Sequence, residues 1–148
     1  MHVKKLAAAA TLLICALPAV SQARDTTVYL PLDKAVAEAT RTGKIDGSVK
    51  FYLAGNTPTG TVTVVSPGAV TNKKTNAFNK TDAVACEWVA QSAIISLFQA
   101  AKGAGANAVT NIVSFYKSNE RKDATNYECH AGAIMAGVAL KGDLAKVQ

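Results

Sequence analysis

The alternation of hydrophobic and polar residues predicts two strands and a helix before residue 55. Val28-Tyr29-Leu30 indicates a short strand that ends at Pro31. Asp33 can cap a helix that runs to about Arg41, because small and apolar residues recur there at helical spacing on one side. From Ser48 to Ala54 every second residue is apolar, which is typical of a half-buried strand.

Turn residues and β-branched residues predict a hairpin after this strand. Gly55-Asn56-Thr57-Pro58 has the composition of a turn, and Thr61 to Val65 is β-branched throughout. We therefore expect residues 61–65 to pair with residues 48–54. Ser66-Pro67-Gly68 should end this strand, and a polar loop is expected from Thr71 to Thr81.

The strongest periodic signal in the chain is a long helix. It is expected to run from Asp82 to about Lys102, with Thr81 or Asp82 as its cap. Gly103 and Gly105 should end it, because glycine readily adopts the left-handed conformation that follows many helices.

The sequence after this helix predicts further strands. Ala108 to Tyr116 is one candidate, and a charged loop follows over residues 117–126. Residues 127–141 predict a long strand or a bent pair of strands, with Gly132 and Gly137 as bulge or bend points.

The expected order is strand, helix, two strands, helix and two strands, with no internal repeat and no interdomain linker. This order predicts one α+β domain over residues 24–148. A mixed sheet of about five short strands would pack against one long and one short helix.

The first 23 residues have the organisation of a secretory signal peptide. Lys4 and Lys5 precede an apolar run from Leu6 to Leu17, and Ser21-Gln22-Ala23 places small residues where a signal peptidase requires them. We expect cleavage near Ala23 and a periplasmic or secreted location. Cys15 lies within the apolar run, where it is either a lipid-attachment residue or, as we expect, an ordinary apolar residue.

The net charge of the chain excludes few classes of function, but it indicates which kinds of partner the protein could attract. The chain has 16 Lys and Arg against 10 Asp and Glu, so loss of Lys4 and Lys5 leaves a net charge of +4. This mild excess favours weak attraction to anionic surfaces such as lipid headgroups, and its scatter along the chain does not indicate nucleic-acid binding. We expect no membrane span, because polar residues interrupt the apolar stretch at 90–101.

Export would leave Cys86 and Cys129 in an oxidising compartment. Cys86 shares a stripe of the long helix with small residues, and Cys129 alternates onto the same strand face as Ala131 and Ala133. These faces allow the helix to lie close to the sheet, so we expect a disulfide between the two cysteines. The alternative is a pair of free, buried thiols.

The long helix has a second apolar side, roughly opposite the cysteine stripe. It is formed by Val84, Trp88, Ile95 and Phe98. One helix cannot bury both sides against one sheet. Either the N-terminal strand and helix cover this second side, or it is the interface of a homo-oligomer, where Trp and Phe are enriched.

The motifs of several enzyme classes are missing from the sequence. A nucleotide-hydrolysing site needs a Gly-rich loop that ends in Gly-Lys-Ser/Thr, and the sequence contains none. Gly103-Ala104-Gly105-Ala106 follows a helix instead of opening one. No serine lies in a nucleophile-elbow pattern and no carboxylate pair stands out. We therefore name no catalytic residue and expect no cofactor.

Glu128 and His130 are the strongest candidates for proton chemistry. They alternate onto one face of the late strand, where they can form a hydrogen bond, whereas the adjacent Cys129 points to the other face. The alternative is a surface pair without a proton-transfer role. No metal site is expected, because Cys86, Cys129 and His130 are too few ligands for zinc.

The densest polar cluster lies in the loop expected from residue 71 to residue 81. It could contact an anionic polymer or a carbohydrate, or it could be a solvated loop whose Asn side chains bind their own backbone. The candidate binding residues here are Asn72, Lys73, Lys74 and Asn76.

The second half of the chain resembles a known family. The features that carry the resemblance are the Cys at the start of the long helix, Gly105-Ala106-Asn107-Ala108-Val109 entering a strand, and Cys129-x3-Ala133-x3-Gly137-x-Ala139-Leu140. Over about residues 84–141 the chain resembles the periplasmic domain of the Rcs-system envelope stress-sensor lipoprotein and the YbjQ-like small domains. The resemblance implies a small α+β domain and supports pairing Cys86 with Cys129.

The chain departs from that sensor, since it lacks a second cysteine pair and the lipid anchor. Over its whole length, and especially from Thr71 to Trp88, it also resembles small exported bacterial proteins catalogued as "excinuclease ATPase subunit". That label is chemically implausible here, because there is no phosphate loop and no set of zinc-finger cysteines.

These features together predict an exported, periplasmic, non-enzymatic binding or envelope-stress module with an unknown partner or ligand. Its working surface would combine the Asn/Lys cluster at residues 71–80 with Glu128 and His130. The alternatives are an uncharacterised enzyme that uses Glu128 and His130, and a structural subunit of a homo-oligomer.

Overall fold

The computed structural model describes residues 23–148, so the signal peptide expected at the start of the chain lies outside the described residues, apart from Ala23. The described part contains six strands and two α-helices, with a short 3-10 helix, η1, before the fifth strand. Their bounds are β1 Thr26–Pro31, α1 Leu32–Arg41, β2 Lys50–Leu53, β3 Val62–Asn76, α2 Asp82–Gly103, β4 Ala108–Ser114, η1 Tyr116–Ser118, β5 Asn126–Ala131 and β6 Met135–Val147.

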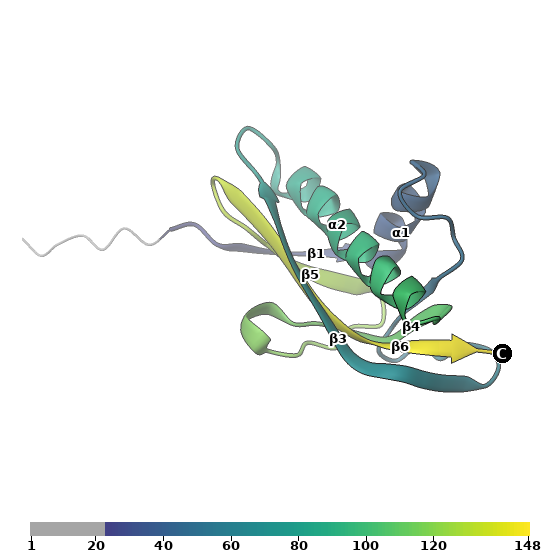
Figure 1. Cartoon of the computed structure of the whole chain (residues 1–148). Coiled ribbons are helices and arrows are strands. Elements are labelled where there is room, and N and C mark those ends of the chain that lie inside the picture. The colour runs from purple at the N-terminus through teal and green to yellow at the C-terminus, as the bar shows by residue number, and fades with distance from the viewer. Residues whose placement is uncertain (1–22) are drawn as a thin grey trace, which may run out of the picture.

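The long strand β6 is the centre of one mixed sheet. Along one edge it pairs with β3, and along the other it pairs first with β5 and then with β4, all antiparallel. β1 extends the sheet beyond β5, and β2 extends it beyond β4. Both helices lie on one side of this curved sheet (Figure 1). The α+β class is confirmed, with six strands of which β3 and β6 are long.

The hairpin expected between residues 48–54 and 61–65 is wrong. β2 pairs in parallel with β4, so Lys50 lies opposite Ala108 and Phe51 opposite Val109. β3 is 15 residues long and β2 has only four, whereas β6 has 13 residues and can pair with β3 along nearly its whole length. The pairing that satisfies more backbone groups therefore prevails over the neighbour in sequence.

The break expected at Ser66-Pro67-Gly68 is a β-bulge inside a continuing strand. The register shifts between Ser66 and Ala69, and the backbone N–H of Gly68 donates to the Asp143 carboxylate at 2.9 Å in place of a ladder bond. Gly68 has a φ of +66°, which glycine adopts without strain. Pro67 lacks a backbone N–H and is tolerated at such a bulge.

The prediction of a polar loop from Thr71 to Thr81 is also wrong over its first half, because β3 extends to Asn76. Thr71 pairs with Leu140, and Lys74 pairs with Gly137. Alternation then directs Asn72, Lys74 and Asn76 to the sheet face away from the helices. A polar sequence can form this strand because β6 supplies its hydrogen bonds and one of its two edges is unpaired in the described part of the chain.

Of the two alternatives for residues 127–141, a long strand or a bent pair of strands, the pair is confirmed, as a hairpin of two strands. Gly132 lies in the turn between them, whereas Gly137 lies opposite His130 with no register shift. β6 also continues to Val147, beyond the expected end. Since β4 precedes this hairpin, three strands follow the long helix instead of two.

The two helices begin differently. In α2 the hydroxyl of Thr81 accepts a hydrogen bond from the backbone N–H of Val84 at 3.2 Å, as the sequence predicts for a cap. In α1 the cap position is Pro31, and Asp33 lies inside the first turn instead of capping it. A carboxylate there still faces the positive end of the helix dipole.

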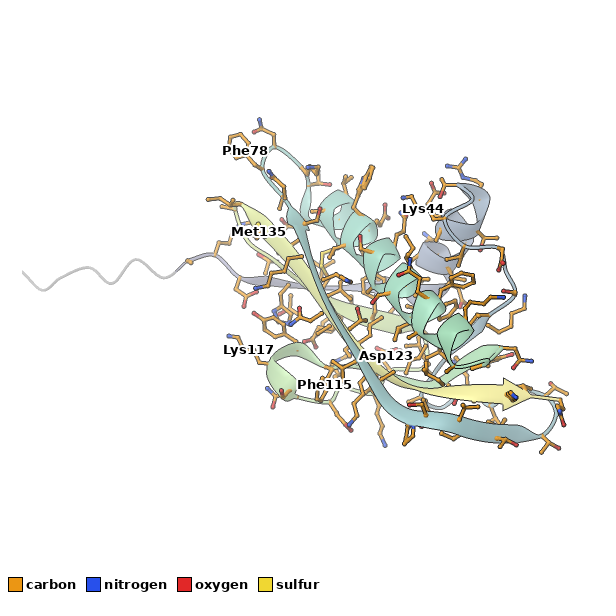
Figure 2. All side chains as sticks on the ribbon, viewed as in Figure 1. Lys44, Phe78, Phe115, Lys117, Asp123 and Met135 are labelled. Carbon is orange, nitrogen blue, oxygen red and sulfur yellow. A yellow bond between two sulfur atoms is a disulfide. The ribbon has the colours of Figure 1, made fainter. Side chains whose placement is uncertain are left out.

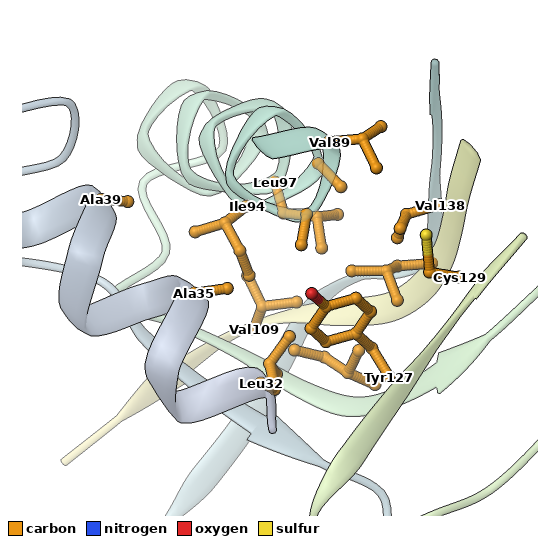
Figure 3. Close-up of a cluster of buried hydrophobic side chains, with 14 of the residues drawn as sticks. Leu32, Ala35, Ala39, Val89, Ile94, Leu97, Val109, Tyr127, Cys129 and Val138 are labelled. Carbon is orange, nitrogen blue, oxygen red and sulfur yellow. The ribbon is translucent and has the colours of Figure 1, made fainter. Parts of the chain in front are cut away.

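A single apolar core lies between the helices and the sheet, as Figure 3 shows. The cysteine stripe of α2 is buried as expected, and a disulfide joins Cys86 to Cys129 with their Cα atoms 5.8 Å apart. Beside it, the hydroxyl of the buried Tyr127 donates to the backbone carbonyl of Cys86 at 3.2 Å. Burial, with a smaller contribution from the charge of Glu87, raises the pKa of this phenol well above its ordinary value.

The second apolar side of α2 is partly covered. Ile95 and Phe98 are partly buried and pack against the core, while Trp88 remains 57 % exposed and Val84 41 % exposed. The homo-oligomer face proposed from the sequence therefore reduces to these two exposed residues, a small area for a stable interface.

By length and composition alone, α2 would also be able to cross a bilayer. The core helix of a soluble domain meets the same criterion, and the buried side of α2 packs on this sheet.

Candidate functional site

The polar face of β5 carries a fixed histidine. Nε2 of His130 lies 2.7 Å from a carboxylate oxygen of Glu128, and Nδ1 lies 3.0 Å from a carboxylate oxygen of Asp25. The ring of Tyr116 stacks on the imidazole, with 3.4 Å between centroids and 12° between planes. Both ring nitrogens and one ring face of His130 are thus already engaged.

Glu128 is held from its other side by an arginine. Nε of Arg121 lies 3.8 Å from the second oxygen of Glu128, and the guanidinium lies over the ring of Tyr29 at 4.1 Å. Asp123 anchors the same arginine at 3.1 Å. Hydrogen bonds from backbone N–H groups, first that of Asn126, hold the pKa of the Asp123 carboxyl below its ordinary value.

A hollow of about 620 Å³ opens beside His130 at the end of the β5–β6 hairpin. Its floor is formed largely by small and apolar residues of the hairpin turn and the start of β6, and polar side chains surround it. The lining residues are Ala23, Arg24, Asp25, Lys74, Tyr116, His130, Gly132, Ala133, Ile134, Met135, Ala136 and Gly137.

Arg24 joins the elements at the edge of this hollow. Its guanidinium makes two hydrogen bonds to the carboxylate of Asp82, at 2.8 and 3.0 Å, and a third to the backbone carbonyl of Gly132 at 2.8 Å. The hairpin turn is therefore tied to the first turn of α2. Asp82 neutralises Arg24, so among residues 23–148 Lys74 is the basic lining residue that has no carboxylate within ion-pair distance.

The structure brings only part of the predicted surface together. Lys74 and His130 line the same hollow, since both lie opposite Gly137 in the sheet. Lys73 points to the helix side, away from them. The side chain of Asn76 accepts a hydrogen bond from the backbone N–H of Phe78 at 2.7 Å, as in the solvated alternative.

Sequence reasoning missed several residues of the site, among them Tyr116, Arg24 and Asp25 at the hollow and Arg121 beside Glu128. Tyr116 opens η1, which follows β4, and its ring stacks on the imidazole of His130. The aromatic pair Phe115-Tyr116 directly before a charged loop was the available signal. Figure 2 shows Phe115 and Lys117 on the side of the sheet opposite the helices.

A second hollow, of about 540 Å³, lies between the two helices and includes Trp88. The ammonium of Lys44 lies 5.1 Å from the centre of the Trp88 ring and donates to the side chain of Gln91 at 2.8 Å. Glu38 and Arg41 also form an ion pair here, whereas Lys34 and Glu87 make no ion pair within residues 23–148.

Within residues 23–148, no group of three or more His, Cys, Asp and Glu side chains is arranged to hold a metal ion.

No protein-family model matches the chain, and the searches of curated proteins and of solved structures find no similar protein either.

Proposed function

We propose that this chain is an exported, non-enzymatic binding module, and that the hollow beside His130 takes a small amphipathic anion. The observation that carries the proposal is the combination of an apolar floor with Lys74, whose ammonium has no ion-pair partner among the described residues. Pockets of this kind hold an apolar body by burial and orient it through a few polar groups. Lys74 would bind the acidic group of such a ligand.

The geometry favours a positioning role for His130 over proton transfer. A general base needs a free nitrogen within hydrogen-bond reach of the substrate. Both nitrogens of His130 are bound by Asp25 and Glu128, and Tyr116 covers one face of the ring. The enzyme that would use Glu128 and His130 is therefore the weaker proposal.

The disulfide supports the export part of the proposal. The disulfide between Cys86 and Cys129 is stable in the periplasm or outside the cell, and rare in the cytosol. The basic and apolar start of the sequence and the resemblance to an envelope stress-sensor domain favour the same location. An envelope-stress role remains part of this proposal.

The test uses anilinonaphthalene sulfonate, a fluorescent probe with an apolar body and one acidic group. Lys74→Gln should weaken its binding about tenfold, because it removes a charge-assisted hydrogen bond. The matched control is Lys73→Gln, since Lys73 is the adjacent lysine on the other sheet face. Fluorescence titration that shows equal affinity for both variants would refute the site.

A further inference from the structure

The two most exposed large apolar side chains in the described part of the chain lie at one end of the molecule. Ile134 is 65 % exposed and Phe78 is 62 % exposed, and Met135 beside them is 48 % exposed. The backbone N–H of Ala77 donates to the carbonyl of Ile134 at 2.7 Å, which places the β3–α2 turn against the β5–β6 turn. Figure 2 shows Phe78 and Met135 together at this end. We call these three exposed residues the apolar tip.

Hydrogen bonds fix the backbone of the apolar tip. The N–H of Gly132 donates to the carbonyl of Met135 at 2.8 Å, and the N–H of Lys80 donates to that of Ala77 at 3.1 Å. Arg24 holds the hairpin turn from its other side. The apolar side chains are therefore displayed by two braced turns, so little order has to be gained when they are buried by a partner.

Basic residues surround the apolar tip. Lys80 follows Phe78 in the same turn, and Lys74 lines the hollow together with Ile134 and Met135. Within residues 23–148 neither lysine has a carboxylate within ion-pair distance. The acidic groups nearest to this end are already bound: Asp82 pairs with Arg24, and Asp25 pairs with His130.

We infer that this end of the molecule docks on the surface of an anionic lipid bilayer. The apolar tip would enter the boundary between headgroups and acyl chains, where single Phe, Ile and Met side chains lose their contact with water. Lys74 and Lys80 would lie at the level of the lipid phosphates, whose charge they complement.

This inference goes beyond the proposed ligand site and can fail separately from it. Phe78 and Lys80 are not part of the lining of the hollow, so changes at these two positions test the bilayer surface alone. The Lys74→Gln variant tests the hollow with a soluble probe in the absence of lipid.

The experiment is sedimentation of the exported, oxidised protein with vesicles of phosphatidylglycerol and phosphatidylcholine, and with vesicles of phosphatidylcholine alone. The parent protein should bind the anionic vesicles, and binding should weaken as salt is added. Phe78→Ser should lower the partition coefficient about tenfold. Lys80→Glu should also lower it.

Two matched controls decide the outcome. Trp88→Ser removes an aromatic side chain that is 57 % exposed on the side of α2, and Lys146→Glu reverses a charge near the far end of β6. Both should leave binding within about twofold of the parent. Absence of binding to anionic vesicles, equal binding to neutral ones, or equal losses in the tip and control variants would overturn the inference.

Discussion

The two faces of β5 have opposite characters, although their residues alternate along six positions. On the helix side Tyr127, Cys129 and Ala131 are at most 1 % exposed and contact the core or the disulfide. On the other side Glu128 and His130 bind each other, Asp25 just before β1, and Arg121 in the charged loop. The first face holds the fold together, and the second carries the polar residues of the proposed ligand site.

The comparison teaches that one strand can hold the core on one face and leave the polar side chains of its other face free for a role such as the proposed binding. Buried contacts lose packing and leave unsatisfied groups when they are changed, whereas polar side chains near solvent are replaced by water at small cost. The predictions below rank changes by the face they affect, from the largest expected loss of stability to the smallest.

Replacing both Cys86 and Cys129 with Ala should cause the largest loss. The disulfide closes a loop across a sequence separation of 43 residues, and its removal should lower the free energy of unfolding by about 4 kcal/mol on loop-entropy grounds. Urea denaturation of the variant and the oxidised parent measures this difference. A loss below about 1 kcal/mol would show that packing alone holds α2 on β5.

Tyr127→Phe should cost about 1 kcal/mol at neutral pH, because the Cys86 carbonyl loses its donor. Burial raises the pKa of Tyr127, so the folded state favours the neutral phenol. That contribution is fully present below the pKa of an unfolded tyrosine, about 10, and is lost as the pH rises above it.

The parent should therefore lose stability above about pH 10 more steeply than the Tyr127→Phe variant, which lacks the ionisable group. Thermal denaturation of both proteins between pH 7 and pH 11 provides the measurement. Parallel stability curves would contradict the buried, neutral state of this phenol.

Lys74→Gln should have the smallest effect on stability. Its ammonium makes no ion pair within residues 23–148, so the free energy of unfolding should change by less than about 0.5 kcal/mol. The same variant should lose affinity for the anionic probe. If its stability instead falls by more than about 2 kcal/mol, Lys74 belongs to the fold and the separation of the two faces fails.

The helix side of the molecule could be predicted from the sequence because its signals are local. The 3.6-residue period from Asp82 onward places Cys86 among the small residues of α2 that become buried. The two-residue period around Cys129 separates it from Glu128 and His130. Together these two periods predict that the Cys86 face of α2 packs against the Cys129 face of β5.

Strand partners could not be predicted in this way. The β-branched segment at Thr61–Val65 is suited to pairing with residues 48–54 or with any other strand, and only the length of β6 decides between them. Because the strand continues past Pro67, Lys73 and Lys74 become neighbours on opposite faces. The predicted binding surface was divided for that reason.

The remaining members of the site depend on contacts between distant parts of the chain. Arg24 and Asp82 are 58 positions apart, and no local pattern links them. Tyr116 of η1 stacks on His130 of β5, a contact between two different elements. Such contacts form only when distant segments of the chain fold together, so the spacing of hydrophobic residues along the sequence does not reveal them.

The central place of β6 has a consequence for the timing of folding. β3, β4 and β5 all take hydrogen bonds from residues 135–147, so a nascent polypeptide that ends before this segment has no partner for its longest strand. The sheet can close only after the ribosome has made almost all of the described sequence. That delay suits the export proposed for this chain, in which an unfolded polypeptide passes through a translocation channel.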